Sequence, residues 1–132
     1  MSKRGAGIAF LCGNKMLLLK RSGKVSNSHT WSPPGGFVEK GETDLDAAIR
    51  ESDEEILNLP KRYVITGEYE FRHPDMKYTM YVAQILKPFN PKLNWENEDY
   101  KWVELSQLGK YRLHPRFAQG MEKIKEMSHA IS

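Results

Sequence analysis

The stretch from Trp31 to Leu59 limits the possible folds of this chain more than any other. Apolar and small side chains recur there at spacings of three and four, which predicts a helix with one buried stripe. Thr43 suits the N-cap of this helix, and Asp46 suits the reciprocal position of a capping box. We expect the helix to end near Asn58, before Pro60. The stripe consists of Leu45, Ala48, Ile49, Ser52, Ile56 and Leu59.

A neighbouring face of the same helix is acidic. At about 100° per residue, Glu51, Glu54 and Glu55 fall within an arc of roughly 100°, and Arg50 flanks them. Like charges this close repel one another, and a divalent cation relieves that repulsion. Mg²⁺ and Mn²⁺ prefer such oxygen ligands, although a solvated acidic face would have the same sequence.

The residues around this helix match a known pattern. Trp31, Pro34 and Gly35 form a W-x-x-P-G-G approach with the next glycine. The six residues that follow the pattern at its spacing are Gly36, Glu42, Arg50, Glu51, Glu54 and Glu55. This run resembles the Nudix box, which reads G, five residues, E, seven residues, R-E, an apolar residue, any residue, E-E, any residue, G, apolar.

Three positions depart from the box. Ser52 and Asn58 stand where apolar residues are usual, and Leu57 stands where glycine is usual. Ser52 lies on the buried stripe, so we expect its hydroxyl to donate to a carbonyl of the preceding helical turn. None of the three is a metal ligand in the family, so the departures bear on the loop after the helix.

Composition fits a single domain over residues 1–132, with 39% hydrophobic and 28% charged residues. A net charge of +3 is too weak to indicate nucleic-acid binding, so we do not expect RNA as a partner. One cysteine, Cys12, excludes an internal disulfide. The apolar run near the N-terminus is too short for a signal peptide or membrane span, so we expect a cytoplasmic protein. We expect this protein to be a monomer or a homodimer.

Periodicity and turn signals predict the other elements. The order is β-β-β-α-β-β-loop-β-α, which defines an α/β or α+β layered domain. The resemblance implies a Nudix α/β/α sandwich with a mixed central sheet. The expected strands cover residues 5–12, 16–21, 37–38, 62–72, 77–86 and 100–104, with a turn at 73–76, a helical turn at 105–109 and a helix at 115–128.

The resemblance also implies a metal centre with Mg²⁺ or Mn²⁺ as cofactor. Its ligands would be Glu51, Glu54, Glu55 and the carbonyl of Gly35. Arg50 would orient these carboxylates, and Glu54 or Glu55 would position the attacking water.

A further acid is implied in the loop 87–99. Glu98, four residues before Trp102, resembles the acid that many family members place there to reach the metal or act as general base. Glu96 and Asp99 compete for this role.

Three residues are candidates for the substrate side. Arg21 ends a strand, and the resemblance implies that it binds phosphate or base; the alternative is a solvated strand end. Gly36 lets the backbone approach a ligand closely. Glu42 would bind substrate, support its loop or bind an outer metal. Phe71, Tyr78, Tyr81 and Trp95 would each either stack on a base or belong to the core.

The activity that the resemblance implies is hydrolysis of a nucleoside diphosphate linked to a group X, giving a nucleoside monophosphate and X-phosphate. The small size favours a nucleoside triphosphate or modified dNTP, as in the MutT-like branch. ADP-ribose and dinucleoside polyphosphates are alternative substrates. A binding module that senses a nucleotide without turnover is an alternative of a different class.

Overall fold

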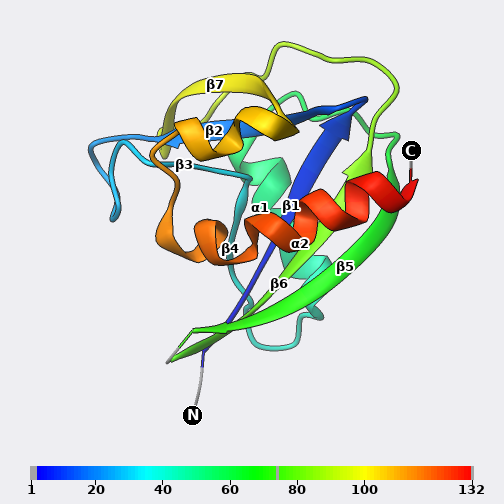
Figure 1. Ribbon diagram of the computed structural model, residues 1–132. Helices are drawn as coiled ribbons and strands as arrows, with labels where there is room; N and C mark the ends of the chain where they lie inside the picture. Colours follow the sequence, from blue (N-terminus) through cyan, green and yellow to red (C-terminus); the bar gives the residue numbers. More distant parts are fainter. Residues whose placement is uncertain (1–2, 74, 132) are drawn as a thin grey trace.

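The computed structural model describes residues 3–73 and 75–131, which form a sheet between two helices (Figure 1). None of the helices in this described part has both the length and the apolar character to cross a bilayer. The elements are β1 Lys3–Cys12, β2 Lys15–Arg21, β3 Trp31–Ser32, β4 Gly35–Phe37, α1 Asp44–Glu55, β5 Val64–His73, β6 Met76–Gln84, β7 Asn97–Glu104, the 3-10 helix η1 Leu105–Lys110 and α2 Pro115–Ile131.

The sheet is mixed, as expected. Its strand order is β3-β2-β1-β6-β5, while β4 also pairs with β1 and β7 with β2. β1 runs parallel to β6, with Lys3 opposite Met76, and antiparallel to β2 and β4. The first strand therefore occupies the middle of the sheet.

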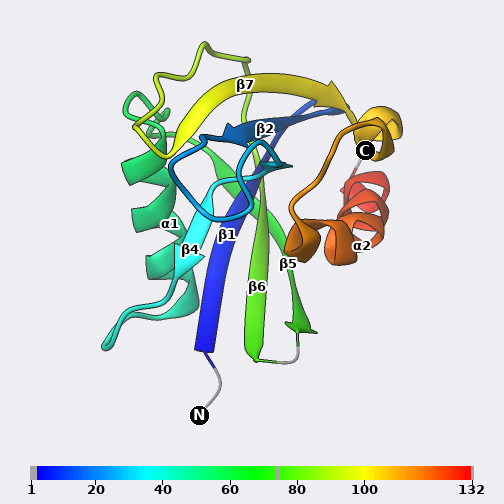
Figure 2. The ribbon, with the colours of Figure 1, turned by 90° about the vertical axis from the view of Figure 1, so that its left-hand side faces the viewer.

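Alternating side chains of β1 supply both faces of the core. Ala6, Ile8 and Phe10 face the cluster that includes Ala47 and Ala48 of α1. Ala9 and Leu11 belong to the opposite cluster, which α2 covers with Phe117 and Ile124. Figure 2 shows α1 and α2 on opposite sides of the sheet, which confirms the predicted α/β/α sandwich.

The start of α1 follows the prediction. The side chain of Thr43 accepts from the amide of Asp46, and the Asp46 carboxylate accepts from the amide of Thr43, which completes the capping box. Ser52 Oγ donates to the Ala48 carbonyl at 2.7 Å, also as expected. The Leu45 and Ile49 side chains are partly buried against the α1-side core.

The predicted end of α1 is wrong. The helix ends at Glu55, and Ile56 adopts an extended conformation with φ −121° and ψ 98°. Ile56 then forms a β-bridge with Leu93, and the Leu57 amide donates to the Lys92 carbonyl. Because the chain leaves the helix without a left-handed residue, Leu57 can stand where glycine is usual.

Several strands begin at other residues than predicted, because they pair with strands that are distant in the sequence. β1 begins at Lys3 because Lys3 pairs with Met76 of β6. β7 begins at Asn97 rather than residue 100, because Asn97 pairs with Arg21 across a register shift in β2. Strand pairing between β1 and β4 starts at Gly35 rather than residue 37. β5 and β6 begin and end within two residues of expectation, and Pro74 of the turn lies outside the described residues.

Candidate functional site

The last two turns of α1 lie against the Gly35–Gly36 backbone. Glu51 packs so closely on Gly36 that a Cβ there would lie 2.4 Å from the Glu51 carboxyl carbon. One turn further, Glu55 Oε2 accepts a hydrogen bond from the Gly35 amide at 2.9 Å. The missing side chain of Gly36 therefore lets the Glu51 carboxylate approach the backbone of β4, whereas a Cβ at Gly35 would meet the Tyr78 hydroxyl and the backbone of β1.

Glu55 is almost fully buried, with 3% of its surface exposed. Its other oxygen accepts from the Asn97 amide group at 3.0 Å. Burial raises the pKa of Glu55 to about 8, although the bonds from Asn97 and Gly35 oppose this shift. The charges of Glu96 and Glu51 raise it further, so several acids share one region.

Arg50 connects the acidic residues to their supporting loop. Its guanidinium donates to both oxygens of Glu42, at 2.8 and 3.0 Å, and to Glu51 and Glu54, each at 3.1 Å. It also donates to the Phe37 carbonyl at 3.1 Å. The hydrogen bonds to Glu42, followed by those to the other carboxylates, raise the pKa of Arg50 above its ordinary value. Arg50 thus orients carboxylates, which is a positioning role.

The bonds of Glu42 tie a loop to the helix. Besides Arg50, its Oε1 accepts from the Glu39 amide at 2.9 Å. These hydrogen bonds hold the pKa of Glu42 below its ordinary value, with the Arg50 bond foremost. The geometry supports the loop role rather than the substrate role that we assigned to Glu42.

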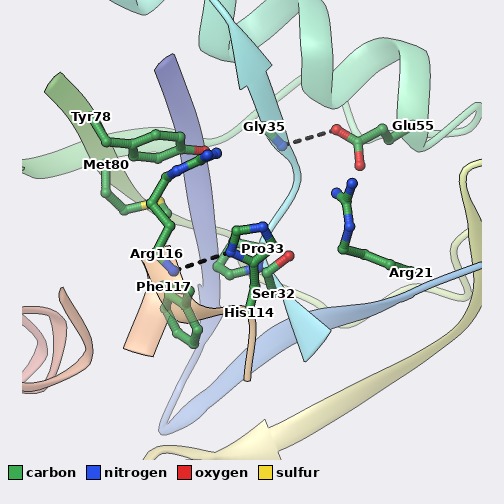
Figure 3. Close-up of a pocket in the computed structure, with 10 residues that line it drawn as sticks. All are labelled: Arg21, Ser32, Pro33, Gly35, Glu55, Tyr78, Met80, His114, Arg116 and Phe117. Atoms are coloured by element: carbon green, nitrogen blue, oxygen red, sulfur yellow. Dashed lines mark hydrogen bonds between the residues drawn. The ribbon is translucent and has the colours of Figure 1, made fainter. Parts of the chain in front are cut away.

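A cavity of about 200 Å³ opens beside Glu51 and is lined by both acidic and basic residues. Its lining includes Glu51, Glu96, Gly35 and Gly36. A smaller hollow next to it is lined by Glu55 and Tyr78, and both share Arg21 as a lining residue. Figure 3 shows the Arg21 guanidinium pointing toward the Glu55 carboxylate. The cavity brings together the predicted Gly35, Gly36, Glu51 and Arg21.

Two residues of this cavity were missed by sequence reasoning. His114 and Arg116 flank Pro115 at the start of α2 and line both hollows. The Arg116 guanidinium lies 5.4 Å from the centre of the Tyr78 ring, within cation–π range. The only sequence feature that could have indicated them is their position on either side of a proline that begins a helix. Hydrophobic periodicity does not predict a function for such positions.

Glu98 and Glu96 have different surroundings. Glu98 lies within 3.0 Å of His29 Nδ1 and 3.6 Å of Lys20 Nζ. Glu96, its rival, lines the cavity with Glu51 and accepts from the Asn94 amide group at 3.2 Å. The structure thus places Glu96 at the carboxylate cluster, whereas the role of Glu98 stays a prediction.

The donor set has the chemistry that a hard cation requires. Burial first, and then repulsion from Glu54, raise the pKa of Glu51, so a cation beside it would stabilise its charged form. In the described residues, however, no three His, Cys, Asp or Glu side chains converge as a preformed metal centre. Arg50 holds Glu51 and Glu54, so a cation would have to displace part of these bonds. The Gly35 carbonyl as a ligand stays a prediction.

Of the four aromatic candidates for base stacking, Tyr78 and Tyr81 are buried in the core, at 6% and 7% exposure. Phe71 is partly buried and stacks on Tyr78. Trp95 is 63% exposed beside Glu96, so it alone of these four retains an open ring. Trp31 is core.

The comparisons agree with this architecture. Bis(5'-nucleosyl)-tetraphosphatase (asymmetrical) of Caenorhabditis elegans is 33% identical over 84 residues, covering 58% of this chain and 60% of that protein. The 8-oxo-dGTP diphosphatase of Escherichia coli K12 is 23% identical over 114 residues, covering 86% and 88%. A crystal structure of a C. elegans Ap4A hydrolase binary complex has a TM-score of 0.80 at 24% identity, covering 96% of this chain and 98% of that chain.

The NUDIX domain model matches residues 1–126, and the chain therefore belongs to the Nudix family. The matched region spans 60% of the length of the C. elegans tetraphosphatase. Likeness to the solved structure at this identity supports the fold.

Proposed function

We propose that the protein hydrolyses a phosphoric anhydride bond of a nucleoside diphosphate linked to a group X. The observation that carries this proposal is that one cavity is lined both by Glu51 and Glu96 and by Arg21, His114 and Arg116. The negative charge of a phosphate chain repels a nucleophile. Its hydrolysis therefore needs carboxylates that hold a divalent cation and basic residues that bind the phosphates. Relatives named for hydrolysis of diadenosine tetraphosphate and 8-oxo-dGTP support a nucleoside polyphosphate as substrate.

Mg²⁺ or Mn²⁺ would be held by Glu51, Glu54 and Glu55 with the Gly35 carbonyl, and would neutralise phosphate charge and acidify water. Arg50 donates hydrogen bonds to two of these carboxylates, Glu51 and Glu54, and would orient them for a cation. Glu96 is the acid that we favour for accepting the proton of the attacking water, with Glu54 and Glu98 as alternatives. The water oxygen bonds to phosphorus while the bridging P–O bond breaks, and X-phosphate leaves.

A panel of substrates tests this proposal. It contains dNTPs, 8-oxo-dGTP, diadenosine tetraphosphate, ADP-ribose and nucleotide sugars, each with Mg²⁺ and with Mn²⁺. Glu54→Gln should reduce turnover by orders of magnitude while the fold is retained. Asp53→Asn is the matched control, since Asp53 is exposed on the same helix and makes no ion pair within the described residues.

A near-normal rate for Glu54→Gln would refute the assignment of the metal centre. No turnover of any substrate by the wild type, with Mg²⁺ still raising the melting temperature, would favour the nucleotide-binding module. Substrate preference within the panel would decide between the triphosphate and dinucleoside polyphosphate alternatives.

A further inference from the structure

The two residues that depart from the box after α1, Leu57 and Asn58, both bind the loop 87–96 that leads to β7. The Leu57 amide donates to the Lys92 carbonyl at 2.8 Å. The Asn58 side chain accepts from the Lys92 amide at 2.7 Å and donates to the Asn90 carbonyl at 2.9 Å. An apolar residue, which is usual at this position, could form neither bond of the Asn58 side chain.

The contacts of Asn58 are the first of a series that continues along the loop toward the cavity. Leu93 forms the β-bridge with Ile56 and is partly buried against the α1-side core. The Asn94 amide then donates to the backbone carbonyl of Glu55, the last residue of α1, at 3.1 Å. The loop therefore lies beside the C-terminal end of α1, where Figure 2 shows the segment between β6 and β7.

The backbone and the carboxylate of Glu96 are held by different groups. The Ser22 amide donates to the Glu96 carbonyl at 2.8 Å, which fixes the backbone from β2. The carboxylate accepts from Asn94 Nδ2 at 3.2 Å, and Asn94 Oδ1 accepts from the Glu96 amide at 3.0 Å. The direction of the carboxylate beside Glu51 therefore depends on the place of Asn94.

Residues 92–94 are attached to α1 and the segment directly after it. Tyr100 and Trp102 of β7 also bind the loop, but at Asn90 and the Phe89 carbonyl, before this segment begins. Within the described part of the chain, the hydrogen bonds from residues 92–94 to other elements all lead to residues 55–58. Loss of these bonds would release Asn94 while β7 still holds the start of the loop.

We propose that Asn58 is a positioning residue for Glu96, because it holds residues 92–94 against the end of α1. Asn94 in turn orients the Glu96 carboxylate at the cavity. The consequence for the reaction rests on the proposed function, in which Glu96 accepts a proton from the attacking water. Asn58 is not among the described residues that line the cavity, so it acts through the loop.

Amide hydrogen exchange, measured by NMR on Asn58→Ala, tests the attachment of the loop without any turnover. The amides that decide are those of Asn94 and Glu96, because the substitution leaves their own acceptors in place. We expect both to exchange about ten-fold faster than in wild type, since local opening becomes easier. The amide of Ile85, which donates to the Leu11 carbonyl at 2.9 Å in the sheet, should be unchanged.

Two further variants complete the exchange experiment. Asn14→Ala is the matched control, because Asn14 is exposed and its side chain forms no hydrogen bond within the described part of the chain. Asn58→Asp should recover part of the protection, since a carboxylate still accepts from the Lys92 amide but cannot donate to the Asn90 carbonyl. Unchanged exchange at both loop amides of Asn58→Ala would overturn the proposal. Equal acceleration of the sheet amide would overturn it too, because the effect would then be general destabilisation.

Kinetics of single and double variants test whether Asn58 acts through Glu96. Asn58→Ala should lower kcat several-fold with little change in KM, because the carboxylate is misplaced while the substrate contacts remain. In a Glu96→Gln background the same substitution should not lower kcat further, since residues that act through one group are not additive. An equal loss in both backgrounds would contradict the role of Asn58. Faster exchange at the loop amides, in a protein that hydrolyses no substrate of the panel, would refute the proposed function alone.

Discussion

The side-chain amide of Asn97 donates to Glu55 Oε1 over 3.0 Å, from the first residue of β7 to the last residue of α1. Both side chains are buried. A carboxyl group in this position is protonated more readily than one in water, because burial penalises its charged form.

Stability without metal should therefore fall with rising pH. Burial raises the pKa of Glu55 from 4.5 to about 8, so between these values the folded state holds a proton that the unfolded state has released. The free energy of unfolding should decrease across this range in wild type, and less steeply in Glu55→Gln. Urea unfolding at pH 5, 6, 7 and 8 measures it, with Asp53→Asn as control. Parallel profiles for wild type and Glu55→Gln would contradict the assignment.

Divalent cations should stabilise the protein. A ligand that binds only the folded state contributes about 2.7 kcal/mol at 100 times its Kd. We expect Mg²⁺ or Mn²⁺ to raise the melting temperature of wild type, and to raise it much less for Glu51→Gln, since Glu51 is part of the donor set. Calorimetric melting with and without chelator measures this. The same gain in both proteins would place the cation elsewhere.

Gly36→Ala should separate activity from fold. Its Cβ would lie 2.4 Å from the Glu51 carboxyl carbon, which must then move. A misplacement of about 1 Å can cost roughly 100-fold in rate, so we expect a loss of that order with native circular dichroism. Gly109→Ala is the control, because nothing lies within 4 Å of a Cβ there. Full activity of Gly36→Ala would contradict the requirement for this position of the Glu51 carboxylate.

Ser52→Ala should leave stability nearly unchanged. Among the residues that the structure describes, the buried hydroxyl donates only to the Ala48 carbonyl, which the helix backbone already satisfies. We expect a change below about 1 kcal/mol, because alanine also has the higher helix propensity. Urea unfolding would detect a larger loss, which would indicate a further partner of the hydroxyl.

Local signals determined which features could be predicted. The capping box of Thr43 and Asp46 and the bond of Ser52 depend on residues within four positions, and all were predicted from the sequence. The end of α1 depends on Leu93, some forty residues away, and was missed. Nothing near Asn58 indicates that its side chain bonds Asn90 and Lys92 instead of ending a helix.

The surroundings of the acidic residues of β7 also could not be predicted from local sequence. Strand alternation alone does not reveal the register shift between Lys20 and Arg21, which pairs Lys20 with Asp99 and Arg21 with Asn97. Glu98 is the extra residue in this irregularity and turns to Lys20 and His29. His114 and Arg116 line the cavity because α2 begins beside it. The position of α2 depends on its packing against the assembled sheet, which the sequence near these two residues does not indicate.

The central position of β1 constrains the order of folding. Its residues pair in parallel with β6 as far as Leu11 opposite Gln84. The middle of the sheet therefore cannot close until β6 has left the ribosome, and the apolar β1 must wait for this distant partner. Contacts so far apart in sequence slow folding, so newly made chains should depend on chaperones to shield β1 during synthesis.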